Sequence, residues 1–269
     1  MMKRTLSLTA LLAGVALWAG CGDGGPGSTV AIRFGTTPLA SATGPMAAPG
    51  ASLSGAAAQE ITLEGSNGRL TITDIWVIVE ELELEPVETG DCDDDVVEVE
   101  CPDFELRYLF IQVPVNGSDV SVAVTQAEGV FDELEFEVGD AEVDDDDDED
   151  LADAQLIQDM FDNEILPRFP KWLPKASMVV VGTFAVKNAD GSFGNPVPFE
   201  TYFEAEIEVE LDLNPAFDTA TDSEIVVRLD PARWFARGDG TVWDLSALQG
   251  QLVEFELEME DGWEIEIDD

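Results

Sequence analysis

The stretch RLTITDIWVIVEELELEP, residues Arg69–Pro86, is the longest apolar run after the N-terminal segment and predicts a long β-strand. β-Branched residues dominate it, which suits the pleated surface of a sheet. Its apolar alternation changes phase twice, and a strand keeps one face buried through a phase change only if it inserts an extra residue. We therefore expect β-bulges near Thr73–Asp74 and Glu80–Glu81. The alternative is a central strand covered on both faces at Ile75–Val79, which needs no bulge.

Alternation of apolar and polar residues predicts further strands along the chain. The clearest runs over Phe199–Leu213, with apolar side chains on one face and acidic ones, Glu204 to Asp212, on the other. The last runs over Leu252–Ile267 and breaks at Gly262. The remaining predicted strands are Thr29–Gly35, Phe104–Val115, Val120–Val124, Phe131–Val138, Met178–Lys187 and Glu224–Leu229.

Turns and one helix separate these strands. Asn116-Gly117 is a strong hairpin dipeptide and predicts a tight turn between two strands. Leu151–Leu166 carries an apolar stripe at helical spacing, follows the acidic run Asp144–Asp150, and is ended by Pro167, Pro170 and Pro174. The sequence thus predicts an all-β fold, a single antiparallel β-sandwich over residues 59–269, with one inserted α-helix at about 151–166.

The charge balance restricts the partners of the chain. Its 269 residues include 12 Lys+Arg against 58 Asp+Glu, a formal net charge of −46. Nucleic acid is excluded as a partner because phosphate binding needs a basic surface. Histidine is absent, which excludes Ser-His-Asp and Cys-His catalysis and most zinc sites. The apolar fraction of 45% nevertheless supports a folded core.

The N-terminus has the pattern of an export signal. Met1–Gly20 combines the basic Lys3 and Arg4 with a short apolar segment that ends in Ala19-Gly20-Cys21. This pattern resembles a bacterial lipoprotein signal, in which the cysteine becomes lipidated and N-terminal. The resemblance implies lipidation of Cys21, export to the cell envelope and, with glycine after the cysteine, sorting to the outer membrane. The alternative is an ordinary secretory signal.

The segment 21–58 predicts a Gly/Ala/Pro-rich tether between the lipidated cysteine and the folded domain, with an early strand at 29–35. Beyond it, Cys92 and Cys101 are the remaining cysteines of the chain. Because export leads to an oxidising compartment, we expect a Cys92–Cys101 disulfide that closes a short acidic loop.

Several motifs together resemble a group of uncharacterised bacterial lipoproteins. They are GSNGRLTITDIWVIVEELELE, the paired cysteines in an acidic loop, VFDELEFEV, ASMVVVGTF, EAEIEVELDL and DPARWFARGDGTVWDL. These lipoproteins are akin to a domain-of-unknown-function family with a prealbumin-like β-sandwich. The resemblance covers the chain from about Glu60 to its end and implies fold and export. It implies no activity and no catalytic residues.

The acidic residues suggest two uses. Rows of carboxylates at Glu204–Asp212 and Glu254–Glu260 predict a solvated acidic face that is more stable in high salt, because like charges opposite one another destabilise a sheet. Acidic loops also supply the oxygen ligands that calcium prefers, and this hypothesis implies calcium as the cofactor. Its candidate ligands are Asp144, Asp145, Asp146, Asp239 and Asp244.

Two other chemistries stay open. Phe217-Asp218-Thr219-Ala220 is similar to the active loop of aspartic proteases, and a carboxylate pair could serve a hydrolase. Exposed tryptophans beside carboxylates could stack on sugars, although tryptophans more often belong to a core. The candidates in the mature chain are Trp76, Trp172, Trp234, Trp243 and Trp263.

The sequence therefore favours a non-catalytic surface, binding or adhesion protein, held at a membrane by its lipid and facing a cell-envelope protein or a carbohydrate. The alternatives are a calcium-binding module and a carboxylate-based hydrolase. A hydrolase needs two acids that converge in a concave pocket, whereas a binding module can present a flat acidic face.

Overall fold

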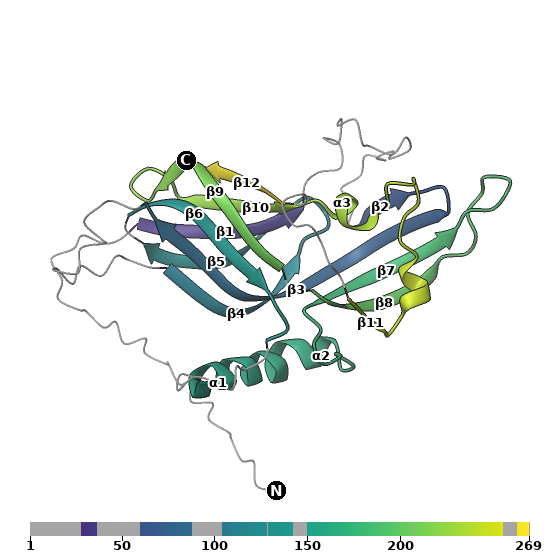
Figure 1. Cartoon of the computed structure of the whole chain (residues 1–269), viewed down its shortest axis with the longest axis horizontal. Coiled ribbons are helices and arrows are strands. Elements are labelled where there is room, and N and C mark those ends of the chain that lie inside the picture. The colour runs from purple at the N-terminus through teal and green to yellow at the C-terminus, as the bar shows by residue number, and fades with distance from the viewer. Residues whose placement is uncertain are drawn as a thin grey trace, which may run out of the picture.

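Two β-sheets form a sandwich with a helical segment, residues 150–168, on its outside, which confirms the predicted fold class (Figure 1). The computed structural model describes residues 28–36, 60–87, 104–127, 129–141, 150–205, 207–254 and 263–268. The four-stranded sheet has the order β12-β10-β1-β5, and the eight-stranded sheet has the order β11-β8-β7-β3-β6-β9, with β2 and β4 also paired to β3. Two pairings, β1 with β10 and β11 with β8, are parallel.

The strands are β1 (Ser28–Thr36), β2 (Ile61–Glu64), β3 (Gly68–Pro86), β4 (Phe104–Val113), β5 (Asp119–Ala127), β6 (Val130–Val138), β7 (Met178–Val186), β8 (Val197–Glu204), β9 (Ile207–Asp218), β10 (Glu224–Leu229), β11 (Leu252–Glu254) and β12 (Trp263–Asp268). The helical elements are α1 (Asp150–Met160), the π-helical turn η2 (Phe161–Ile165), α2 (Leu166–Arg168), α3 (Pro231–Phe235) and the 3₁₀ turn η3 (Leu245–Leu248). Within the described residues, no helix has the length and apolarity needed to cross a membrane.

Strand β3 is the centre of the large sheet, and both predicted bulges are present. The register of β3 shifts between Ile72 and Asp74 against β7, and between Val79 and Glu81 against β6. Each extra residue restores the phase, so the apolar side chains of β3 face one core along its whole length. Ile78 points to the opposite face and is also fully buried. The bulges are therefore confirmed, and the alternative is right that the strand is covered on both faces but wrong that it needs no bulge.

The large sheet consists of strands laid end to end along β3. On one edge β7 pairs with residues 68–77 and β6 with residues 79–86, so the helical segment is inserted between two collinear strands. In the next row, β8 pairs with β7 and β9 pairs with β6. The predicted strand Phe199–Leu213 is thus interrupted at Ala205, but its inward face is continuous, because Phe203, Ala205, Val209 and Leu213 lie in one core cluster.

Strand irregularities line up where the helical segment leaves the sheet. Opposite the bulge at Glu80, Tyr108 of β4 has a positive φ of 56°. The outer row has a gap between β8 and β9, and Ser177, the residue before β7, closes it. Its buried hydroxyl accepts a hydrogen bond from the Ala205 nitrogen (2.7 Å) and donates one to the Phe203 carbonyl (3.3 Å). This hydroxyl satisfies a backbone group that the interrupted ladder would otherwise leave unpaired.

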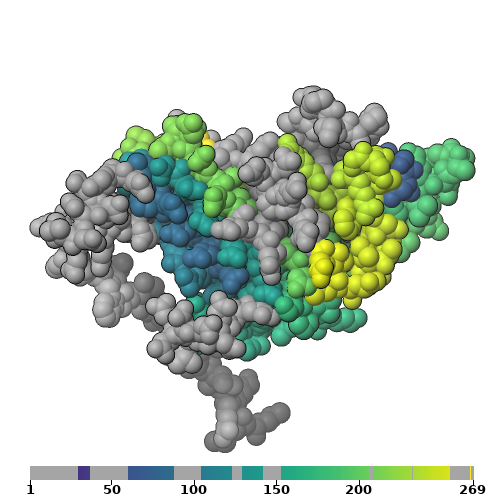
Figure 2. Space-filling view, viewed as in Figure 1, coloured from purple at the N-terminus to yellow at the C-terminus, as the bar shows by residue number. Residues whose placement is uncertain are grey.

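The two faces of the large sheet carry separate cores. The inner core packs the small sheet against β3, β4, β6 and β9, and Phe34 of β1 meets Phe136 of β6 edge to face at 5.4 Å. Further along the same face, the segment from α3 to η3 packs on β8, and its atoms are yellow-green in Figure 2. The Thr201 hydroxyl of β8 donates a hydrogen bond to the Leu245 carbonyl at 3.0 Å. The outer core lies under the helical segment.

Three local predictions are wrong. Asn116-Gly117 does not close a hairpin, since β4 pairs in the large sheet and β5 in the small one, and Pro114 follows the end of β4. Leu252–Ile267 is not one strand, because β11 and β12 belong to different sheets. The helical segment continues past Pro167 to Arg168, because the π-helical turn before the proline accommodates its missing N–H.

The prediction of an early strand at 29–35 is confirmed by β1, which lies between β10 and β5 within the small sheet rather than standing apart on a tether. Other predictions fall outside the described residues. These are the signal segment Met1–Gly20, the lipidated Cys21, the Cys92–Cys101 disulfide and the aspartates Asp144, Asp145 and Asp146.

Candidate functional site

A set of carboxylates lies on the outer face of the large sheet, beside the helical segment. We call this surface the acidic face, and it consists of Glu81, Glu83 and Glu85 of β3, Glu105 of β4, Glu133, Glu135 and Glu137 of β6, and Glu210 and Asp212 of β9. Apolar residues alternate with them and are buried in the inner core, among them Leu82, Leu134 and Val209. The burial of the apolar side of these strands therefore places the acids on the outer side, where most are half-buried and Glu105, Glu210 and Asp212 are exposed.

The strand register places these acids directly opposite one another. One row crosses four strands as Glu105, Glu83, Glu135 and Glu210. A second row is Glu85, Glu133 and Asp212, and a third begins with Arg107 and continues as Glu81 and Glu137. Side chains directly opposite in a sheet have Cβ atoms about 4.5–5.5 Å apart, and like charges at that distance repel. The acidic face is therefore a surface of high negative charge density.

Burial and the neighbouring carboxylates raise the pKa values of two of these acids, Glu133 and Glu81. Burial raises the pKa of Glu133, and the neighbouring carboxylates of Glu85, Glu210 and Asp212 raise it further. The pKa of Glu81 is raised by burial and by Glu105, although the guanidinium of Arg107 acts to lower it. These acids hold their protons more tightly than free carboxylic acids do.

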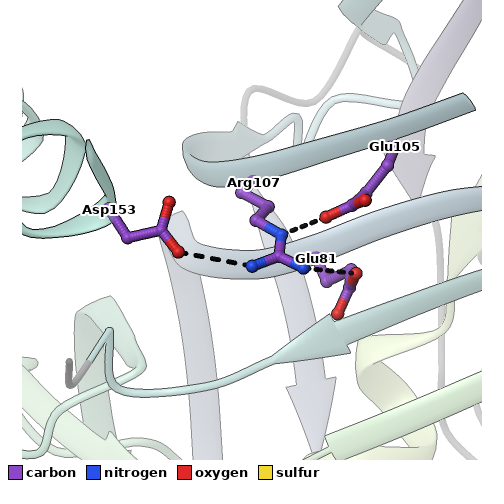
Figure 3. A network of polar contacts seen from close by, with 4 residues as sticks. All are labelled: Glu81, Glu105, Arg107 and Asp153. Carbon is purple, nitrogen blue, oxygen red and sulfur yellow. Dashed lines mark hydrogen bonds and ion pairs between the residues drawn. The ribbon is translucent and has the colours of Figure 1, made fainter. Parts of the chain in front are cut away.

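Arg107 joins the acidic face to the helical segment (Figure 3). Its guanidinium donates a hydrogen bond to Glu105 of the same strand, lies 3.6 Å from the Glu81 carboxylate, and donates to Asp153 of α1 at 3.3 Å. The hydrogen bond to Glu105 raises the pKa of Arg107. This one cation thus partly neutralises the acids around it and ties α1 to the sheet.

Beyond the bulge at Glu80 the outer face becomes aromatic. Trp76 stacks on Phe110 at 4.8 Å, and Phe169 and Trp172, which follow the helical segment, meet Phe110 edge to face. Arg168 lies 5.0 Å above the Trp76 ring. These rings belong to the outer core, so they fix the position of the helical segment on the sheet.

The other candidate sugar-binding tryptophans lie apart from this cluster. Trp234 is only 4% exposed in the inner core. Trp243 is partly buried at the edge of that core and lies under the guanidinium of Arg237, 4.6 Å from its ring. Trp263 belongs to β12 of the small sheet. The four tryptophans whose side chains the structure describes therefore do not form a common platform.

The two predicted calcium ligands that the structure describes, Asp239 and Asp244, accept hydrogen bonds within their own turns. Asp239 accepts hydrogen bonds from the nitrogen (2.9 Å) and hydroxyl (2.6 Å) of Thr241. Asp244 accepts from the Ser246 hydroxyl (2.6 Å) and the Ala247 nitrogen (3.3 Å) at the start of η3. Among the described residues, no three carboxylates or thiols are grouped as metal ligands would be.

The protease-like loop is also a structural turn. Asp218 accepts a hydrogen bond from the Ala220 nitrogen at 2.9 Å, and its own nitrogen donates to Asp222 at 2.7 Å. Thr219 is buried and exchanges hydrogen bonds with the backbone of Gly129. These contacts hold the end of β9 against the start of β6.

The sequence alone indicated acidic strand faces but not their union into one surface. It placed one row at Glu204–Asp212 and another at Glu254–Glu260, and of these Glu210 and Asp212 lie on the acidic face. The glutamates of β3 and β6 are the larger part of that face. The regular alternation of these glutamates with apolar residues is the sequence pattern that could have located the face. No sequence pattern indicates that Arg107 contacts Glu81 and Asp153.

The chain matches no family model, no curated protein and no solved structure. Its likeness to bacterial lipoproteins of prealbumin-like architecture therefore stays a prediction.

The acidic face should make the protein more stable as the pH falls toward the ordinary carboxyl range. The pKa values of Glu81 and Glu133 are raised above 4.5, so the folded chain binds protons more tightly than the unfolded chain between pH 4.5 and the raised values. The free energy of unfolding therefore falls as the pH rises through that window. The full loss of free energy is reached once the pH exceeds the raised pKa values of the two glutamates. Urea unfolding across this pH range measures the effect, which solvent screening keeps small.

The Arg107→Gln variant sharpens this pH test. Without the guanidinium, the pKa of Glu81 rises further, so the loss of stability with rising pH becomes steeper. Hydrogen bonds from Ser192 and Thr241 lower the pKa values of Asp190 and Asp239, so the contribution of these aspartates to stability increases with pH and changes only below pH 3.8. They therefore cannot produce the same slope. A stability that is flat or increasing above pH 4.5 in both proteins would contradict the electrostatic account.

Proposed function

We propose that this chain is an exported, membrane-tethered and non-catalytic binding protein whose acidic face receives a cationic partner in the cell envelope. The acidic face carries the proposal: its carboxylates share one side of a sheet and stand in rows across neighbouring strands. A partner that brings positive charge relieves the repulsion among these acids on binding. The export signal ending in Cys21 supports the location.

The geometry favours binding over hydrolysis. A glycosidase-type hydrolase uses two carboxyl groups that face each other across the substrate. On the acidic face, successive carboxylates project side by side from adjacent strands, and Glu81 and Glu133, whose pKa values are raised, each have several other carboxylates nearby. Such an arrangement provides charge density for a basic surface rather than one acid and one base.

Neutralising the centre of the acidic face should weaken binding to a polycation. Polylysine serves as the probe, and the variant combines Glu83→Gln, Glu135→Gln and Glu210→Gln, three members of the longest row. We expect about a tenfold loss of affinity in physiological salt, because exposed charge pairs contribute about 0.5 kcal/mol each. Titration calorimetry measures it.

A charge-matched control separates the acidic face from the overall charge. Asp159→Asn, Asp162→Asn and Glu164→Gln remove the same number of charges from exposed positions of α1 and η2. Equal losses of affinity in the two variants would contradict the proposal. Saturable stabilisation by micromolar CaCl₂, absent in NaCl of matched ionic strength, would instead favour a calcium-binding module.

Replacing Cys21 with serine tests the membrane tether. A serine cannot accept the thioether-linked lipid, so the Cys21→Ser protein should leave the membrane fraction while keeping its fold. Fractionation of cells with immunodetection measures this, and the Cys92→Ser protein is the thiol control. Retention of Cys21→Ser on membranes would overturn the lipid anchor but leave the binding face untouched.

A further inference from the structure

The chain contains two Asn-Gly dipeptides, Asn67-Gly68 and Asn116-Gly117, and the structure holds them in different environments. An asparagine followed by glycine is open to attack on its side-chain carbonyl carbon by the next backbone nitrogen, because glycine has no side chain to hinder the approach. The reaction is intramolecular, so its rate depends on how the fold positions the two groups.

Asn116 lies in an exposed turn that favours this attack. The Asn116 Oδ1 accepts hydrogen bonds from the nitrogen (3.0 Å) and the hydroxyl (2.5 Å) of Ser118. They hold the amide carbonyl along the backbone that follows it, and they stabilise negative charge that develops on this oxygen. Gly117 has a φ of 74°, and no atom lies within 4 Å of the place where a side chain would stand, so neighbouring groups do not crowd this glycine.

Asn67 shows the opposite arrangement. Its Nδ2 donates to the Val242 carbonyl at 2.7 Å, and its Oδ1 accepts from the Val242 nitrogen at 2.9 Å, so both ends of the amide are held by another segment. Gly68 is buried at the start of β3, where an added Cβ would come within 2.7 Å of the Ala185 carbonyl oxygen. The Asn67 amide cannot turn toward its own backbone without breaking both hydrogen bonds.

Two other turns repeat the geometry of Asn116 with aspartate in its place. Asp190 accepts from the nitrogen (2.9 Å) and hydroxyl (2.6 Å) of Ser192, and Asp239 accepts in the same way from Thr241. The intervening glycines have φ values of 83° and 79°. These hydrogen bonds lower the pKa of both aspartates, and an ionised carboxylate resists nucleophilic attack. The two turns also show that an aspartate fits this geometry.

We propose that Asn116 is a site of spontaneous deamidation in the folded protein, and that Asn67 is protected by the fold. Hydroxide removes the Gly117 amide proton, the nitrogen bonds to the Asn116 Cγ, and the Cγ–Nδ2 bond breaks to release ammonia. Water then opens the succinimide ring at either carbonyl and leaves an aspartate or an isoaspartate at position 116. One water is consumed and one ammonia released, without any redox step.

The modification changes the crossover between the two sheets. Position 116 lies between β4 and β5, close to the Arg228–Asp119 ion pair of 2.7 Å that joins β10 to β5. The aspartate product adds a negative charge to this link, and the isoaspartate product also lengthens the backbone by one methylene. Aged molecules are thus chemically distinct from new ones at this crossover.

The full chain, incubated at neutral and mildly alkaline pH, tests the proposal by mass spectrometry of peptides spanning each site. We expect the mass gain of an NH-to-O exchange at Asn116, at a rate proportional to hydroxide concentration, while Asn67 stays intact. In urea both sites should react at similar rates, because the fold no longer distinguishes them. Asn116→Gln should abolish the reaction at that site, and Ser118→Ala should slow it.

Two outcomes would overturn the inference. One is an intact Asn116 in the folded chain when both sites react in urea, which would mean that the turn protects it. The other is equal reaction of Asn67 and Asn116 in the folded chain. A Ser118→Ala rate equal to that of the unaltered chain would remove the assigned role of the Ser118 hydroxyl.

Discussion

The Phe136→Ala variant is expected to lose about 3–5 kcal/mol of unfolding free energy, the range for truncating a buried phenylalanine. Phe136 is fully buried in β6, and its ring meets Phe34 of β1 edge to face at 5.4 Å. This pair joins the small sheet to the large one, so the truncation leaves a cavity between the two layers and removes an aromatic contact. Equilibrium unfolding in urea or guanidinium measures the loss.

Val130→Ala provides the comparison for Phe136→Ala. Val130 begins the same strand but is 42% exposed, so its truncation should change the free energy of unfolding by about 0.5 kcal/mol or less. The Phe34→Ala variant should reproduce much of the Phe136→Ala loss, and the double variant should lose less than the sum, because the two rings share one contact. Additive losses would show that the two sheets are held together elsewhere.

Removing the hydroxyl of Ser177 is expected to cost about 1–3 kcal/mol, because it leaves a buried donor without an acceptor. That donor is the Ala205 nitrogen, which is 2.7 Å from the Ser177 Oγ at the break between β8 and β9. The loss should also be local. In the Ser177→Ala protein the Ala205 amide should lose protection from hydrogen exchange before the amides of β8 do.

Ser246→Ala is the matched change for Ser177→Ala. The Ser246 hydroxyl also donates a hydrogen bond, to Asp244 at 2.6 Å, but this pair is only partly buried. Its removal should cost no more than about 0.5 kcal/mol. If the two alanine variants were equally stable, or if the Ala205 amide kept its protection, the Ser177 hydroxyl would not be what closes this gap.

The acidic face gives these stability measurements a functional meaning. Its strands belong to the large sheet, whose inner side is covered by the small sheet through contacts such as Phe34 with Phe136. The strong inner core offsets the repulsion among carboxylates on the outer side. Binding of the proposed cationic partner would relieve the repulsion that remains among these carboxylates.

The alternation of apolar and polar residues predicted many of the strands, because the face on which a side chain lies depends only on its neighbours in the sequence. The phase changes in Arg69–Pro86 located both bulges of β3, and the alternation in Phe131–Val138 predicted the strand β6. Both follow from one requirement, that apolar side chains of a strand reach the same core. The interrupted strand at Ala205 kept its predicted face for the same reason.

The tertiary structure alone decided which strands pair. Asn116-Gly117 has the letters of a hairpin, yet the strands on its two sides enter different sheets. β1 pairs with β10 although nearly two hundred residues separate them, with Ala31 opposite Glu224. Such pairings depend on contacts between distant segments, whose free energies no local pattern contains.

The acidic face shows the same division. That its glutamates would lie on the outer side of the sheet followed from the sequence, because they alternate with apolar residues of the inner core. That Glu105, Glu83, Glu135 and Glu210 would stand in one row followed only from the register of four strands. Arg107 reaches Asp153 only because the helical segment inserted between β6 and β7 folds back beside β4. Alternation fixes the side of the sheet on which a residue lies, whereas pairing fixes its neighbours, and the charge density of a surface depends on both.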